Sequence, residues 1–231
     1  TALALIGLGS VGAEMTRLDD YSDLDFFAIV KDGSKADYIN DLSWLSEIAP
    51  ITYTFRNTAD GYKLLFEDGV FCEFAVFEMD ELLQAVYAPG RIIWKAEDVD
   101  ETIRIPQKKT PPRQQSSMEW LVGEALTNLY VGLCRDKRGE KLSASRFIQG
   151  YAVDRILELA EHLTEPAVGD PDSFDLERRF EQRYPDIAEK LPLFVQGYAR
   201  NAESAQEILA FLDAHFEVNA AMKDEILKLC E

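Results

Sequence analysis

Apolar residues in the first hundred positions come in short runs separated by polar stretches, a pattern typical of strands with short connections. The run ALALIGL at 2–8 ends in glycines and predicts a buried central strand. The segment DLDFFAIV at 23–30 is rich in aromatic and β-branched residues and predicts a second buried strand. Further strands are expected at 51–55, 62–66 and 70–77, with a short edge strand at 91–94.

Two local signals indicate how these strands are connected. The pair Asp68-Gly69 favours a tight hairpin turn between the strands at 62–66 and 70–77. Between 34 and 48, apolar side chains recur at the spacing of one helical face, with Ser34 as the expected N-cap and Pro50 as the stop. We therefore expect one amphipathic helix at 34–48.

The second half of the chain has the periodicity of helices throughout. Helices are predicted at 117–135, 143–163, 174–183, 187–200 and 202–216. Before them, the segment PQKKTPPRQQSS at 106–117 holds three prolines and no large apolar side chain, which is typical of a linker. The sequence thus predicts an α+β protein with a mixed-sheet domain at 1–105, a linker at 106–117 and an all-helical domain at 118–231.

Composition and charge exclude several classes of protein. The 231 residues are 47% hydrophobic and 29% charged, enough to bury the core of one or two domains. The formal charge of −18 disfavours binding to nucleic acid or to an anionic membrane. No apolar run approaches the roughly 20 residues of a membrane span, and the first residues lack a basic signal region, so we expect a cytoplasmic protein. Three widely spaced cysteines predict neither a disulfide framework nor a zinc site.

The glycines after the first strand allow two interpretations. Gly7, Gly9 and Gly12 match the dinucleotide-binding fingerprint G-x-G-x-x-G, and Asp32 lies twenty residues beyond Gly12. The helix that should follow would have only Met15 and Leu18 as apolar contacts before an acidic stretch. The sheet is also too short for a second mononucleotide-binding half. A Rossmann dinucleotide-binding protein is therefore the less favoured interpretation.

Three carboxylates carry the other interpretation. Asp23 and Asp25 share one face of the second strand because side chains alternate along a strand. Two adjacent like charges repel unless a cation lies between them, and hard oxygen ligands suit Mg²⁺, which takes the rest of its shell from water and substrate phosphates. Glu73 adds an acid inside an apolar strand, where it is costly without a partner. A solvated acidic loop and an exposed edge strand remain open as alternatives.

These residues resemble a known family signature. Gly9-Ser10, then residues 22–26 (SDLDF), then Glu73 resemble the hG[GS]…Dh[DE]h…h[DE]h pattern of the nucleotidyltransferase superfamily that includes DNA polymerase β and the antibiotic-modifying adenylyltransferases. Residues 138–143, 146–149 and 151–155 are similar to the helical C-terminal domain of lincosamide nucleotidyltransferases. The family usually places a glycine four residues after the serine, where this chain has Glu14 and carries Gly12 instead, which leaves the path of the phosphate loop open.

The resemblance implies Mg²⁺-dependent transfer of a nucleoside monophosphate, with AMP expected, from an NTP to a hydroxyl of a small cationic acceptor, with release of pyrophosphate. A lincosamide- or aminoglycoside-like acceptor would make this an antibiotic-resistance enzyme. Asp23, Asp25 and Glu73 are the expected catalytic and metal-binding residues for two Mg²⁺ ions, with Glu73 as metal ligand or general base. The expected nucleotide-binding residues are Gly9, Ser10, Ser22, Arg138, Lys141 and Arg146, and the expected acceptor-binding residues are Glu124 and Tyr130.

Two alternatives to this assignment stay open. The bases Arg138, Lys141 and Arg146 could form a solvated helix–helix turn instead of a phosphate clamp. The chain could also be a regulatory or antitoxin-type nucleotidyltransferase that modifies or binds a protein partner, although such proteins are usually single minimal domains. The expected partners are an NTP and a small acceptor, without nucleic acid or membrane, and a homodimer is compatible with the sequence.

Overall fold

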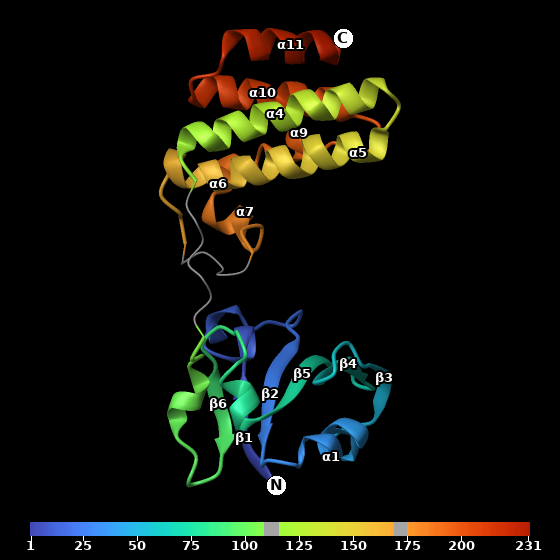
Figure 1. Cartoon of the computed structure of the whole chain (residues 1–231), viewed down its shortest axis with the longest axis vertical. Helices are drawn as coiled ribbons and strands as arrows, with labels where there is room; N and C mark the ends of the chain where they lie inside the picture. Colours follow the sequence, from blue (N-terminus) through green and yellow to red (C-terminus); the bar gives the residue numbers. More distant parts are fainter. Residues whose placement is uncertain (109–115, 169–174) are drawn as a thin grey trace. The chain divides into compact units, whose positions relative to one another are not determined.

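The computed structural model describes residues 1–108, 116–168 and 175–231, and divides the chain into two compact units, Thr1–Pro112 and Arg113–Glu231 (Figure 1). Residues 109–115 of the predicted linker lie outside the described residues. Residue 174, the start of one predicted helix, also lies outside the described residues. Each unit is treated by itself below.

Unit one is built on a mixed sheet in the order β3-β4-β5-β2-β1-β6 (Figure 1). Its strands are β1 (Ala2–Gly7), β2 (Leu24–Val30), β3 (Ile51–Phe55), β4 (Gly61–Phe66), β5 (Phe71–Glu78) and β6 (Arg91–Lys95). Strands β2 and β5 are parallel, and the other neighbours in the described sheet are antiparallel. The predicted α+β class and the edge position of β6 are confirmed.

The hairpin between β4 and β5 forms at the predicted turn. Gly69 has a φ of +89°, a conformation that side chains other than glycine's rarely adopt. Its amide donates a hydrogen bond to the Phe66 carbonyl at 3.1 Å, and the Phe66 amide donates to the Val70 carbonyl at 2.9 Å. This turn sets the register in which Lys63 pairs with Glu73.

The two faces of the sheet carry separate apolar clusters. Helices α1 (Lys35–Asn40) and α2 (Ser43–Ser46) contribute Ile39 and Leu45 to the cluster on one face. Helix α3 (Met79–Leu82), the following loop and the 3-10 turn η3 (Glu101–Arg104) belong with the cluster on the other face, which includes Ile6, Ile29, Leu82, Tyr87 and Val99. Because side chains alternate, Asp25 shares this second face with Phe27, and Glu73 shares it with Phe77.

The predicted single helix at 34–48 is wrong, because the chain forms α1 and α2 with a break at Asp41. The Asp41 side chain accepts a hydrogen bond from the Ser43 amide at 2.9 Å, so it competes with the helical backbone pattern and starts a new turn. Within the described residues the Ser34 side chain makes no capping bond; instead Glu78 Oε1 accepts from the Gly33 amide at 2.7 Å. Ile48, expected on the apolar face, is 77% exposed.

Unit two is helical throughout its described residues. Its helices are α4 (Met118–Lys137), α5 (Lys141–Ser145), the π-helical η4 (Arg146–Ala152), α6 (Val153–Leu163), α7 (Phe180–Arg183), α8 (Pro185–Ala188), α9 (Leu191–Phe194), α10 (Asn201–His215) and α11 (Ala220–Cys230). The Ser117 hydroxyl caps α4 by accepting from the Trp120 amide at 3.2 Å. The core between α4, α6 and α10 buries Leu129, Ile156 and Ile208 completely.

The helices predicted at 117–135 and 202–216 are confirmed as α4 and α10, and the segment at 143–163 is helical throughout, as the end of α5, η4 and α6. The segment at 187–200 forms two short helices, α8 and α9, and the helix expected over 174–183 is described only as α7. Helix α11 was not predicted, and it packs on α4 and α10 (Figure 1). Over the ranges that the structure describes, no helix is both long and apolar enough to cross a membrane.

Candidate active site

The three predicted acids come from two parallel strands that lie next to each other, β2 and β5. Asp25 on β2 and Glu73 on β5 are direct register partners. Asp23 immediately precedes β2 and, by alternation, lies on the same face as Asp25. Neighbouring strands are about 4.8 Å apart, so the backbone alone brings the carboxylates of Asp25 and Glu73 side by side. The structure thus places Asp25 beside Glu73, and a metal site shared by all three acids stays a prediction.

Glu73 is held by two donors that the sequence interpretation missed. Asn57 Nδ2 donates to Glu73 Oε1 at 2.9 Å, and Lys63 Nζ lies 2.9 Å from Glu73 Oε2. Lys63 is the register partner of Glu73 on β4, and the two side chains are 40% and 41% exposed. The hydrogen bond and the charge of Glu73 raise the pKa of Lys63 above its ordinary value, and Asp25 and Asp23 add to this. The acidic cluster therefore already contains an ammonium group.

The glycine loop lies directly against Asp25. Gly9 has a φ of +53°, and the Leu8 amide donates to the Asp25 carbonyl at 2.8 Å. A Cβ atom added at Gly9 would lie 3.7 Å from Asp25 Oδ2, so this position faces the carboxylate. Ser10 follows in the 3-10 turn η1 (Gly9–Val11). The loop and the acid therefore form one site, as the resemblance implies.

Gly12 has a structural role that explains the departure from the family pattern. A Cβ atom at Gly12 would lie 2.7 Å from the Gly7 carbonyl oxygen, a distance that is too short for real atoms. The Gly12 amide also donates to the Gly9 carbonyl at 3.0 Å. Glycine is thus needed where the loop folds back onto the end of β1, and Glu14 lies beyond this tight approach.

The surroundings of the loop differ from those of a dinucleotide-binding site. That site needs a strand, a helix that starts at the third glycine, and a second strand parallel to the first. Here β1 and β2 are antiparallel, and in the described chain between them the 3-10 turns η1 and η2 (Met15–Arg17) stand in place of the helix. The alternative interpretation of the glycines therefore lacks its structural context.

Ser22 makes hydrogen bonds within the loop that precedes Asp23. Its hydroxyl oxygen accepts from the Asp19 amide at 3.0 Å and lies 3.1 Å from Asp19 Oδ1 and 3.3 Å from the Arg17 carbonyl. These contacts close the turn before β2. A contact between Ser22 and a nucleotide stays a prediction.

The remaining predicted site residues belong to unit two. Arg138 Nε pairs with Glu140 at 3.0 Å, and this pair lowers the pKa of Glu140. The guanidinium of Arg146 lies 5.3 Å from the ring centre of Tyr151, and the Lys141 carbonyl accepts from Asn201 at 3.3 Å. Each of these contacts is compatible with the solvated-turn interpretation. The phosphate clamp stays a prediction.

The two residues expected to contact the acceptor lie on α4. Glu124 is partly buried, and its carbonyl accepts from Asn128 Nδ2 at 2.8 Å. Tyr130 is 37% exposed, and the charge of Cys134 and a hydrogen bond to it raise the pKa of the phenol. These contacts stay within the helical unit, so an acceptor at Glu124 or Tyr130 stays a prediction.

A cavity of about 600 Å³ lies on the same sheet face as the carboxylates. Its lining residues are Phe27, Asp60, Phe77, Asp80, Glu81, Gln84, Ala85 and Val86. Phe27 follows Asp25 by two residues on one strand face, a separation of about 7 Å. The cavity therefore lies further along the same face than the acidic cluster, none of whose members lines it. Sequence reasoning missed it because its walls come from segments far apart in the chain.

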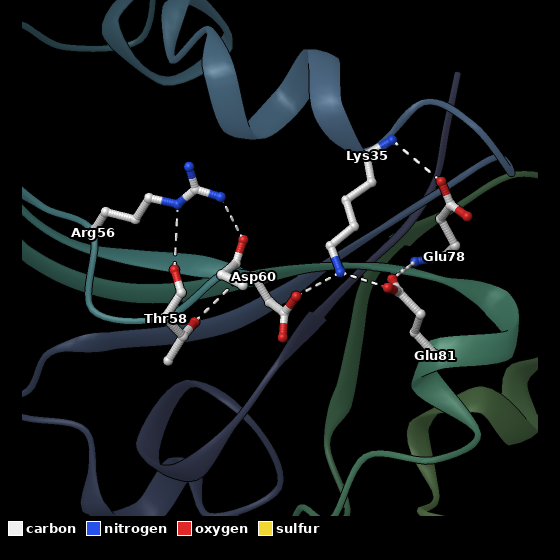
Figure 2. Close-up of polar contacts among 7 residues, drawn as sticks. Lys35, Arg56, Thr58, Asp60, Glu78 and Glu81 are labelled. Carbon is white, nitrogen blue, oxygen red and sulfur yellow. Dashed lines mark hydrogen bonds and ion pairs between the residues drawn. The ribbon is translucent and has the colours of Figure 1, made fainter.

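Lys35 neutralises part of the acidic rim of this cavity. Its Nζ atom lies 2.6 Å from Asp60 Oδ1 and 2.7 Å from Glu81 Oε1 (Figure 2). Burial acts to lower the pKa of Lys35, but the hydrogen bonds to Asp60 and Glu81 outweigh it and raise the pKa. Nζ also lies 5.5 Å from the centre of the Phe77 ring. The Lys35 ammonium thus lies near two carboxylates and an aromatic ring that belong to the cavity wall.

Asp23 and Asp25 are the residues that could hold a divalent cation. Within the described ranges, no group of three or more His, Cys, Asp or Glu side chains is arranged to hold a metal ion. Asp23 and Asp25 offer hard oxygen ligands, which suit Mg²⁺. A metal ion held by them stays a prediction.

No protein-family model matches the chain, and no curated protein matches it in sequence. Among solved structures, the chain is similar to the crystal structure of an aminoglycoside 6-adenyltransferase from Bacillus subtilis, with a TM-score of 0.36 and 12% sequence identity. The similarity covers 98% of this chain and 84% of that chain. A similarity of this size assigns neither a family nor an activity.

Proposed function

We propose that the chain is a nucleotidyltransferase that moves a nucleoside monophosphate, AMP in the simplest case, from an NTP to a hydroxyl of a small cationic acceptor. The observation that carries the proposal is the register pairing of Asp25 with Glu73, with Gly9 against Asp25. Phosphoryl transfer depends mainly on positioning and on electrostatic stabilisation of the reacting phosphate. A rigid sheet with adjacent carboxylates and an amide-lined turn supplies both.

The residues have separate roles in this reaction. Asp23 and Asp25 would hold Mg²⁺, which would offset charge on the triphosphate and help the pyrophosphate to leave. The Gly9 and Ser10 amides and the Ser10 hydroxyl would bind the phosphates beyond the reacting one. The Leu8, Val11 and Gly12 amides donate to carbonyls of the protein instead. Glu73 accepts the proton of the acceptor hydroxyl as its oxygen bonds to the α-phosphorus and the α–β bridging bond breaks. Asn57 keeps the Glu73 carboxylate in position.

The cavity beside the carboxylates supports a cationic acceptor. Asp60, Asp80 and Glu81 line it together with the Phe27 and Phe77 rings, and Lys35 offsets only part of their charge. An acceptor amine could pair with the rim while an apolar face packs on the rings. The roles expected for Glu124 and Tyr130 with an acceptor, and for Arg138, Lys141 and Arg146 with a nucleotide, stay predictions about unit two.

Ligand-dependent thermal stability tests this function against the dinucleotide alternative. ATP with Mg²⁺ should raise the melting temperature in proportion to its occupancy, and ATP with a chelator should raise it much less. NAD(H) and NADP(H) should have no saturable effect. A metal-independent rise with a dinucleotide and no rise with Mg²⁺ and ATP would reverse the assignment.

A further inference from the structure

The Gly9 loop is anchored at both ends, on two different strands. At its start, the Leu8 amide donates a hydrogen bond to the Asp25 carbonyl of β2 at 2.8 Å. At its end, the Val11 carbonyl accepts from two nitrogens of Arg91 on β6, Nε at 3.2 Å and Nη2 at 3.0 Å. Arg91 lies 80 positions from Val11 in the sequence. The second anchor is therefore made by a side chain that the sequence interpretation did not single out.

Backbone packing brings Arg91 to this carbonyl. Gly7 ends β1 and is the register partner of Arg91. The Val11 carbonyl oxygen lies so close to Gly7 that a Cβ atom there would be 2.6 Å from it. A Cβ atom at Gly90, the residue before Arg91, would lie 2.7 Å from the Gly7 carbonyl oxygen. Because real Cβ atoms do not approach backbone atoms this closely, both positions need glycine, and the loop end, β1 and the start of β6 lie in direct contact.

The contact with Arg91 reaches the Ser10 amide through two planar peptide groups. The Val11 carbonyl and the Gly12 amide belong to one peptide group, so a bond that orients the carbonyl also orients the amide. The Gly12 amide donates to the Gly9 carbonyl at 3.0 Å. That carbonyl shares its own peptide group with the Ser10 amide. Arg91 therefore restrains the direction in which the Ser10 N–H points.

A guanidinium is suited to this task because it is planar and presents its donors in a fixed geometry. Two donors on one carbonyl restrict the orientation of the peptide group more than one donor does, and a charged donor makes a stronger hydrogen bond than a neutral one. A lysine ammonium would offer a single point of contact on a flexible stem. The geometry at Val11 therefore depends on the arginine side chain as well as on its positive charge.

We propose, on the basis of the nucleotidyltransferase function above, that Arg91 is a positioning residue for nucleotide binding. It acts through the Val11 carbonyl and holds the Gly9 loop in the conformation that presents the Gly9 and Ser10 amides to the phosphates beyond the reacting one. Arg91 thereby contributes to the affinity for a triphosphate, and it takes no part in the proton transfer.

Hydrogen exchange of the unliganded full-length protein tests the anchor without any nucleotide. In Arg91→Met, peptides that cover residues 8–14 should exchange about tenfold faster, which corresponds to the loss of roughly one net hydrogen bond. Peptides that cover the hairpin at 61–78 should exchange as in the wild type. Lys95→Met, which removes a charge from the same strand, should change neither rate. Equal exchange of residues 8–14 in Arg91→Met and in the wild type would overturn the proposal.

Calorimetric titrations with ATP and with AMP, both in excess Mg²⁺, test the consequence for the nucleotide. AMP lacks the phosphates that the loop would hold, so Arg91→Met should weaken ATP binding about tenfold and leave AMP binding unchanged. Arg91→Lys should weaken ATP binding as well, because it keeps the charge but not the paired donors on Val11. Wild-type affinity for ATP in Arg91→Lys, or an equal loss for ATP and AMP in Arg91→Met, would overturn the positioning role.

The outcomes separate this inference from the function on which it rests. Faster loop exchange with an unchanged ATP affinity in Arg91→Met would overturn the role of Arg91 and leave nucleotide binding by the chain intact. No binding of ATP by the wild type would contradict the nucleotidyltransferase function itself.

Discussion

Asp25 on β2 and Glu73 on β5 are partners in a parallel strand pair, and their carboxylates share one face of the sheet. Lys63 pairs with Glu73 from the other side. The relative positions of these charges are therefore set by strand register, and they do not depend on a mobile loop. A site built on rigid strands holds reacting groups in place before substrate arrives.

The crowding of acids predicts that removal of one of them stabilises the metal-free protein. Asp23→Asn should raise the melting temperature slightly, because Asp23 and Asp25 share one face and like charges repel. The same variant should lose the stabilisation that Mg²⁺ with ATP gives the wild type. Asp98→Asn, an exposed acid in the turn after β6, should change neither property. An unaltered response of Asp23→Asn to Mg²⁺ and ATP would argue against the metal site.

Alanine substitutions at Gly9 and Gly123 should change the free energy of unfolding in opposite directions. Gly9→Ala forces a side chain into the left-handed region at φ +53° and should cost about 1–2 kcal/mol of unfolding free energy. Gly123 lies within α4, and among the described atoms nothing approaches the position of its missing Cβ within 4 Å. Gly123→Ala should therefore stabilise the protein by about 0.5–1 kcal/mol. Urea unfolding of both variants measures the difference, and a stabilised Gly9→Ala would contradict the loop conformation.

Asp154 on α6 predicts a pH-dependent loss of stability. Burial raises the pKa of Asp154 above its ordinary value of 3.8, and the attraction of Arg155 and Arg146 only partly opposes this. The folded protein thus binds this proton more tightly than the unfolded chain does. The resulting stabilisation is present below pH 3.8 and is lost as the pH rises through the folded pKa.

Asp154→Asn removes the buried carboxylate charge, so this variant should be more stable than the wild type at pH 7. The gain should shrink as the pH falls and vanish below the ordinary pKa of the carboxyl. Melting temperatures across this range measure it, with Asp224→Asn on the exposed side of α11 as a control for lost charge. A gain that is independent of pH would show that burial does not perturb Asp154.

Local sequence signals predicted the strands and the hairpin because each depends on neighbouring residues. Asp68-Gly69 specifies its own turn, and alternation within residues 23–30 places Asp23 and Asp25 on one face. The break at Asp41 was missed because the apolar periodicity continues through it while the aspartate side chain binds the Ser43 amide. Periodicity reports which face is apolar and does not report such side-chain competition.

Long-range pairing limited what could be inferred about the site. The parallel pairing of β2 with β5 joins segments that are far apart in sequence, and no local pattern specifies it. The pairing of Lys63 with Glu73 could have been predicted from the sequence, because the hairpin turn at Asp68-Gly69 fixes the register that sets them opposite each other. The contact of Asn57 with Glu73 could not have been predicted, since it depends on the path of the loop between β3 and β4.

Transfer itself tests the central claim most directly. The protein is incubated with α-labelled ATP, Mg²⁺ and a panel of hydroxylated amines, and both labelled acceptor and pyrophosphate are measured. We predict label on at least one acceptor, with one pyrophosphate released for each acceptor modified, and no transfer with chelator or with Glu73→Gln. Absence of acceptor-dependent pyrophosphate across the panel, or equal transfer by Glu73→Gln, would contradict the account.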